Sequence, residues 1–224
     1  MFQSITAETV EACQRWCMDT ANAQQLRWFQ RHVESWIPPA GSAWDADTRD
    51  RLVHDLISDF PKQVQQASNQ RVSTAGQVHQ WLMVHVLESL GWTNGVEFTH
   101  LGSRRQADLR IYGPDHRVCL VEVKSLNARE RLTNSLAQDT RGHDTVVGVG
   151  FFHDATEFNS DTTEALIRTG ALAVYLPKTT WAQLPDSQRL ATNVGQQRFY
   201  RPIRQFAADM THFRMAGRLA PFTD

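Results

Sequence analysis

The sequence has 224 residues, of which 41% are hydrophobic and 21% charged, and its formal net charge at pH 7 is −1. This composition is typical of an ordinary globular protein, and the balanced charge provides no overall basic field that would draw nucleic acid to the surface. No run is long and apolar enough to span a membrane, the N-terminus lacks the apolar segment of a secretory signal, and three cysteines give no disulfide framework. We therefore expect a cytoplasmic protein.

The first part of the chain, residues 1–70, is predicted to be a helical region. Apolar residues recur with helical spacing over 6–36 and again over 47–60, with more helix possible as far as residue 67. A capping box at Thr74–Gln77 opens a third helix, which ends before Gly91. We expect the N-terminal region to supply dimer or DNA contacts.

Strands and helices follow one another over residues 71–178. The predicted strands cover 96–101, 106–112, 117–124, 146–152 and 171–176, and the predicted helices cover 126–140 and 162–168. Residues 179–224 form an extension of mixed composition that carries several arginines, and we expect the whole chain to fold as one compact domain.

Two neighbouring strands have a pattern that fixes how they pair. Alternate residues are apolar over 107–111 and over 119–123, as in half-buried strands, and the segment between them has turn composition. A three-residue loop, Pro114–His116, puts Gly113 opposite Arg117. A two-residue loop would slip the register by one residue and turn the strands' acidic side chains into the core. The apolar pattern therefore favours the three-residue loop.

This register brings two carboxylates across from each other. Asp108 lies opposite Glu122, and Lys124 points the same way, on the face away from the apolar residues. Facing carboxylates repel each other, and Mg²⁺, which prefers oxygen ligands, would remove that cost. Carboxylates, a lysine and a metal ion together are suited to attack by water on a phosphodiester. Of the 23 lysine and arginine residues only three are lysines, so Lys124 is not one of many on a lysine-rich surface.

The motif and the order of elements over about residues 74–176 resemble the PD-(D/E)xK nuclease superfamily. The resemblance implies an α/β (α+β) fold with a restriction-endonuclease-like core, in which a mixed central sheet is flanked by helices. It implies that Asp108, Glu122 and the Val123 carbonyl hold Mg²⁺, that Lys124 orients or activates the attacking water, and that hydrolysis leaves 5′-phosphate ends. Several members carry a supporting Gln or Tyr on the following helix, and Gln138 is the candidate here.

Further residues around the motif have two readings each. Glu88 is the only acid on the third helix and is either a metal ligand or a solvated charge; related nucleases often carry an acid near Gln80, where this chain has none. Polar side chains that flank the motif are natural phosphate or base contacts, or else solvated surface groups. These candidates for DNA binding are Ser103, Arg104, Arg105, Arg129, Arg131, Arg141 and His143.

The leading hypothesis is a Mg²⁺-dependent type II restriction endonuclease that acts on double-stranded DNA as a homodimer. A structure-specific repair or junction-resolving nuclease is the first alternative. A DNA-binding module on an inactive nuclease fold is the second, and the complete set of Asp108, Glu122 and Lys124 argues against it. The sequence has no Walker A motif and no dinucleotide fingerprint, so we expect no nucleotide cofactor.

Overall fold

The computed structural model describes residues 79–80, 83–101, 107–125, 129–140, 145–152 and 154–222. The chain divides into two compact units, Met1–Thr93 and Asn94–Asp224, and each is described by itself. The predicted helices over 6–36 and 47–60, and the capping box, lie outside the described residues. None of the described helices combines the length and the apolar character needed to cross a bilayer.

The described part of the first unit is mostly the end of the third predicted helix. Residues 83–88 are helical, and Gly91 follows with φ +78°, the left-handed conformation predicted for a residue just past a helix. Glu88 lies on this helix, where its carboxylate is 2.7 Å from Nδ1 of His85, one turn earlier.

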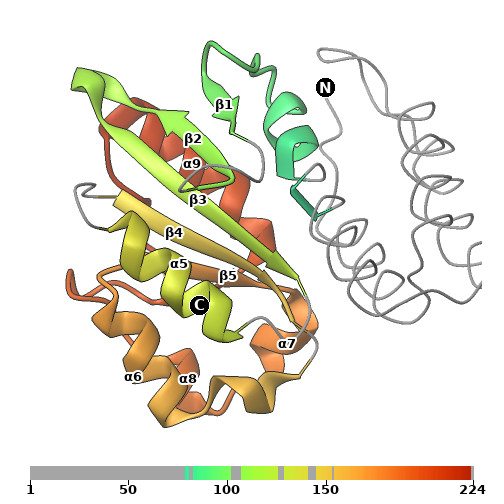
Figure 1. The fold of residues 1–224 in the computed structure, drawn as a ribbon, viewed down its shortest axis with the longest axis vertical. Helices are drawn as coiled ribbons and strands as arrows, with labels where there is room; N and C mark the ends of the chain where they lie inside the picture. The colour runs from blue at the N-terminus through green and yellow to red at the C-terminus, as the bar shows by residue number, and fades with distance from the viewer. Residues whose placement is uncertain are drawn as a thin grey trace, which may run out of the picture. The chain divides into compact units, whose positions relative to one another are not determined.

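The second unit is built around a six-stranded sheet in the order β1-β2-β3-β4-β5-β6 (Figure 1). The pairs β1–β2 and β2–β3 are antiparallel, whereas β3, β4, β5 and β6 run parallel to one another. The first five strands confirm the predicted ones, and the sixth was not predicted. The strands are Phe98–His100, Leu109–Tyr112, Val118–Ser125, Thr145–Phe151, Ala173–Leu176 and Tyr200–Pro202, for β1 to β6.

The predicted register of the β2–β3 hairpin is confirmed. Leu109 pairs with Val121, the Gly113 N–H donates to the Arg117 carbonyl at 2.9 Å, and the loop is a short 3₁₀ turn, η2, over Pro114–His116. The alternation of apolar residues therefore specified the pairing, because a slip by one residue would have put the apolar residues of one strand on the opposite face from those of the other.

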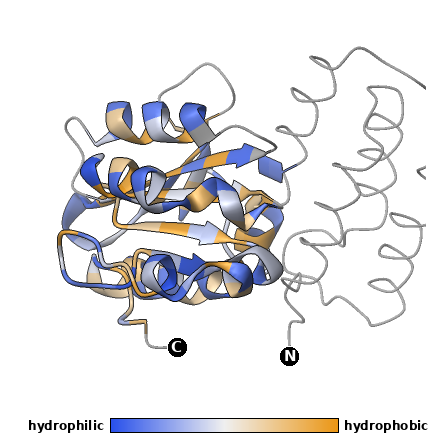
Figure 2. Cartoon of the chain, turned by 90° about the horizontal axis from the view of Figure 1, so that it is seen from below, coloured by the Kyte–Doolittle hydropathy of each residue, from blue (hydrophilic) through white to orange (hydrophobic). Residues whose placement is uncertain are grey.

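Helices cover both faces of the sheet (Figure 2). On one face α5 (Arg129–Asp139) and α6 (Ser160–Arg168), both predicted, pack through Leu132, Leu136 and Leu166 into an apolar cluster of buried residues. On the other face α9 (Phe206–Ala216) sets Phe206 edge-on against Tyr175 of β5, with ring centroids 5.2 Å apart. The face that carries Glu122 of β3 is therefore covered by α5, so β3 is buried on both faces and not half-buried as its alternating pattern predicted.

The C-terminal extension is more structured than its mixed composition predicted. It adds α7 (Lys178–Gln183), α8 (Asp186–Arg189), strand β6 and helix α9. Two further 3₁₀ turns complete the unit, η3 over Ala155–Phe158 and η4 over Ile203–Gln205. Because β6 has three residues, Tyr-Arg-Pro, it carries no alternating pattern by which a strand is recognised.

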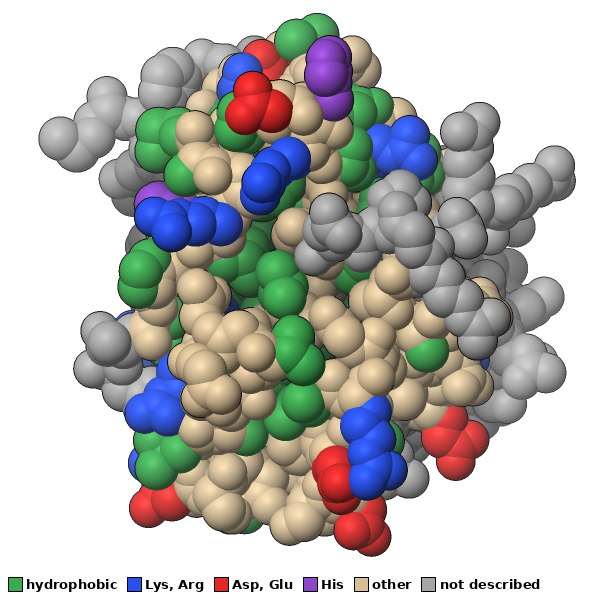
Figure 3. All heavy atoms as spheres, turned by 90° about the vertical axis from the view of Figure 1, so that its left-hand side faces the viewer, with side chains coloured by type: hydrophobic (Ala, Val, Ile, Leu, Met, Phe, Trp, Pro, Cys, Tyr) green, Lys and Arg blue, Asp and Glu red, His purple; other side chains and the backbone are tan. Residues whose placement is uncertain are grey.

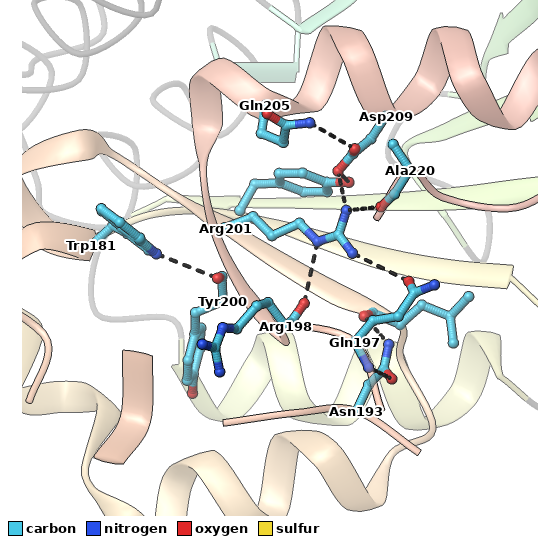
Figure 4. Close-up of polar contacts among 11 residues, drawn as sticks. Trp181, Asn193, Gln197, Arg198, Tyr200, Arg201, Gln205, Asp209 and Ala220 are labelled. Atoms are coloured by element: carbon cyan, nitrogen blue, oxygen red, sulfur yellow. Dashed lines mark hydrogen bonds and ion pairs between the residues drawn. The ribbon is translucent and has the colours of Figure 1, made fainter. Parts of the chain in front are cut away.

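A buried ion pair joins β6 to α9 (Figure 4). Arg201 and Asp209 are both fully buried, and Arg201 Nη1 donates to Asp209 Oδ2 at 2.6 Å and to the Ala220 carbonyl at 2.9 Å. The Tyr175 hydroxyl donates to the same carboxylate at 2.7 Å, and the Gln205 amide donates to its other oxygen at 3.1 Å. Arg201 is thus a structural residue of the extension rather than an exposed charge.

Candidate active site

The three motif residues meet where strand β2 begins. The regular pairing with β3 ends at Leu109, and the Asp108 N–H donates to the Val121 carbonyl at 3.1 Å. The Asp108 carboxylate reaches across and accepts a hydrogen bond of 2.7 Å from the Val123 N–H. An extended residue presents its N–H and its C=O to the same neighbouring strand, so the Val123 carbonyl also faces the Asp108 side.

Lys124 lies between the two carboxylates. Its Nζ donates to Glu122 Oε1 and lies 3.7 Å from Asp108 Oδ2. Asp108 and Glu122 are 5% and 4% exposed, whereas 21% of the Lys124 side chain is exposed. The group is therefore a buried acidic pair, and Lys124 at its rim is the most exposed of the three residues.

Burial dominates the electrostatics of the two acids. It raises the pKa of Asp108, against the opposing effects of Lys124, the Val123 N–H and His100. Burial and then the neighbouring Asp108 raise the pKa of Glu122, while Lys124 and a hydrogen bond from Ser135 act in the opposite direction. One ammonium group thus does not compensate the two carboxylates, and additional positive charge at this place would favour their ionised forms.

Helix α5 brings a further acid, Asp139, toward this group. The residue predicted on this helix was its neighbour, Gln138. The Gln138 side chain is exposed on α5, and its supporting role stays a prediction. Its neighbour Asp139 is fully buried, and repulsion from Glu122 and Asp108 contributes, after burial itself, to raising the pKa of Asp139 to about 7. A signal for this residue was available, because Asp139 lies three residues after Leu136 and seven after Leu132, which are core positions of the same helix face.

The oxygen atoms at the site suit a hard divalent cation. Asp108, Glu122 and the Val123 carbonyl are the ligand types that Mg²⁺ prefers, and the ion commonly keeps several waters beside one or two carboxylates. The excess of buried negative charge also fits a cation here. Among the described residues no three His, Cys, Asp or Glu side chains converge closely enough to hold a metal ion by themselves. A site at this position would therefore complete its coordination with water.

Most of the residues predicted to contact DNA lie outside the described part of the chain. The candidates outside the described residues are Ser103, Arg104, Arg105, Arg141 and His143, together with the side chain of Arg129, whose backbone begins α5. Arg131 is described, and its side chain is exposed on α5. On the face drawn in Figure 3, basic side chains are scattered and some lie beside acidic ones, in line with the balanced composition.

Comparison with known proteins shows a similarity of fold, without a match by sequence. No protein-family model matches the chain, and no curated protein matches it. A solved complex of the restriction endonuclease PspGI with its substrate DNA aligns with a TM-score of 0.52 at 13% identity, over 85% of this chain and 91% of that chain. The mixed sheet flanked by helices and this alignment together show that the chain has a restriction-endonuclease-like fold.

Proposed function

We propose that the chain is a Mg²⁺-dependent endonuclease that hydrolyses phosphodiester bonds in double-stranded DNA, most like a type II restriction enzyme. The observation that carries the proposal is the position of Lys124 between two buried carboxylates on adjacent strands of this fold. A lysine there can hold both a phosphate oxygen and an attacking water, and few purely structural roles require a buried pair of like charges.

Each residue has a distinct part in the proposed reaction. Asp108, Glu122 and the Val123 carbonyl would hold Mg²⁺, which lowers the pKa of bound water and offsets charge on the phosphate. Lys124 orients the water for attack on phosphorus and stabilises the charge that develops in the transition state. The expected products carry 5′-phosphate ends, and Gln138, on the exposed side of α5, is the weakest member of the predicted set.

The proposed partner is double-stranded DNA, and the proposed assembly is a homodimer. The solved structure with the similar fold contains a restriction endonuclease with substrate DNA. Enzymes that cut both strands of a symmetric site generally pair two active sites about a two-fold axis. Light scattering of the free and DNA-bound protein should therefore give the mass of two chains, and a monomer in both states would contradict the dimer.

Digestion of phage DNA tests the proposal directly. With Mg²⁺ we expect discrete fragments, which EDTA should abolish and whose 5′ ends end-labelling should show to be phosphorylated. Cutting confined to branched or flapped substrates would instead support a structure-specific nuclease. Binding without any cutting would support the inactive DNA-binding module.

Substitutions at the acids locate the activity. Asp108→Ala and Glu122→Ala should abolish cleavage and leave DNA binding intact, because they remove metal ligands and also reduce repulsion of phosphate. Glu164→Gln is a control, since Glu164 is exposed and pairs with Arg168 on the surface of α6. Undiminished cutting by Glu122→Ala would overturn the assignment of the site.

A further inference from the structure

Asp139 of α5 is a buried acid whose carboxylate receives no hydrogen bond from the described part of the chain. The residue is fully buried, and neither of its carboxylate oxygens has a hydrogen-bond partner among the described residues. A buried carboxylate without partners is costly, so such a group calls for a ligand or another functional reason.

The surroundings of Asp139 are those of the candidate active site. The charged groups that act on it are Glu122, Asp108 and Lys124. Ser135, one helical turn earlier, lies on the same face of α5 and donates a hydrogen bond to Glu122. One side of α5 therefore presents a hydroxyl and then a carboxylate to the acidic residues of the hairpin.

We propose that Asp139 is a positioning residue for the divalent cation of this site and that it accepts hydrogen bonds from the water molecules coordinated to that cation. The assignment rests on the proposed function, since it presupposes a metal bound by Asp108 and Glu122. A direct place among the ligands is not favoured, because no three acidic side chains of the described residues converge on one point. Contact through coordinated water satisfies both oxygens of Asp139 and leaves the two-carboxylate ligand set unchanged.

The charges at the site agree with this role. When ionised, Asp108, Glu122 and Asp139 carry three negative charges against the single positive charge of Lys124, and one divalent cation would balance the difference. A hydrated cation also brings several hydrogen-bond donors, which both oxygens of Asp139 lack among the described residues.

The test measures metal binding and does not need DNA. Mn²⁺ serves as the probe, because carboxylate oxygens bind it as they bind Mg²⁺ and the free ion can be counted by electron paramagnetic resonance. Asp139→Asn should weaken Mn²⁺ binding roughly tenfold to hundredfold, the loss typical of residues that hydrogen-bond to the ligands of a metal ion. Glu130→Gln is the matched control, since it removes the same charge from an exposed position on the same helix and should bind Mn²⁺ like the parent.

A second measurement separates positioning from a purely structural role. The rise in Tm caused by Mg²⁺ should be smaller in Asp139→Asn than in the parent, whereas a structural role would shift both Tm values and leave the difference unchanged. Asp139→Ser replaces Asp139→Asn if circular dichroism shows that the first variant does not fold.

The outcomes distinguish this inference from the proposed function. A parent protein that neither binds Mn²⁺ nor cuts DNA overturns the proposed function and the role of Asp139 with it. A parent that binds and cuts, together with an Asp139→Asn protein of equal Mn²⁺ affinity and equal Mg²⁺-dependent Tm shift, overturns the role of Asp139 alone.

Discussion

The Lys124 side chain is the most specific chemical feature of the site. Its compact ammonium group contacts Glu122 and lies 3.7 Å from Asp108, a geometry that the broad, planar guanidinium of arginine does not reproduce. We predict that Lys124→Arg loses at least about two orders of magnitude in single-turnover cleavage at saturating Mg²⁺, or roughly 2.7 kcal/mol of transition-state stabilisation.

Lys178→Arg is the control for this substitution, since Lys178 is exposed at the start of α7. Metal binding should survive in Lys124→Arg, because the proposed ligands remain. A cleavage rate within a factor of a few of the parent would reduce Lys124 to a solvated charge and remove the main support for a nuclease.

The raised pKa of the Asp139 carboxyl should make the free energy of unfolding of the metal-free protein depend on pH. Its pKa is about 7 in the folded chain against an ordinary value of 3.8, so the folded state keeps a proton that the unfolded chain releases. The free energy of unfolding should therefore fall as pH rises from about 4 to about 7, and this one group accounts for at most about 4 kcal/mol of the decrease.

Urea denaturation in EDTA checks the sign of this effect. Asp139→Asn should match the parent at about pH 4 and exceed it in stability at about pH 8, because the amide does not ionise. Equal dependence on pH in the two proteins would show that Asp139 is not the titrating group.

At the scale of elements, the hairpin could be predicted and the rest of the site only in part. The sequence specified the β2–β3 register, because a slip by one residue would put the apolar residues of the two strands on opposite faces. This register in turn brings Asp108 across from Glu122. The sequence also contained a signal that α5 turns Asp139 inward, because Asp139 continues the helical spacing of Leu132 and Leu136, but the family resemblance pointed to the neighbouring Gln138 instead. The pairing of β6 was also missed, since Arg201 and Pro202 in a three-residue strand resemble loop composition.

Gly148 of β4 sets how closely α5 approaches the sheet. A Cβ atom at this residue would lie 3.1 Å from Leu132 Cδ1 and 3.4 Å from Leu136 Cδ1, so the Leu132 side chain, or the helix with it, would have to shift by a few tenths of an ångström. We predict that Gly148→Ala costs about 1–3 kcal/mol of stability. It should also slow cleavage, because Ser135 and Asp139 shift with the helix.

Gly195→Ala provides the comparison for Gly148→Ala. A Cβ atom at Gly195 meets only the Asn193 side-chain oxygen, at 3.3 Å, and the loop around it is exposed. Chemical denaturation and single-turnover cleavage of both variants check the prediction, and it is wrong if they differ from the parent by equal amounts.

At the scale of the second unit as a whole, the Arg201–Asp209 pair fixes the C-terminal elements to the sheet. Arg201→Met leaves a buried carboxylate without its cation and should cost about 3–5 kcal/mol in urea denaturation. The double variant Arg201→Met/Asp209→Leu should recover much of that loss, because it removes both charges from the interior. Arg204→Met, at an exposed position, should have little effect.

The two edges of the sheet limit how copies of this chain can associate. Each edge strand has only three residues, and β6 ends in Pro202, which has no backbone N–H to offer a neighbour. Short edges and proline discourage the strand-to-strand addition by which sheets grow between molecules. A two-fold pair of these chains is therefore expected to join through helices and loops, with its two sheets remaining separate and with little tendency to stack into fibres.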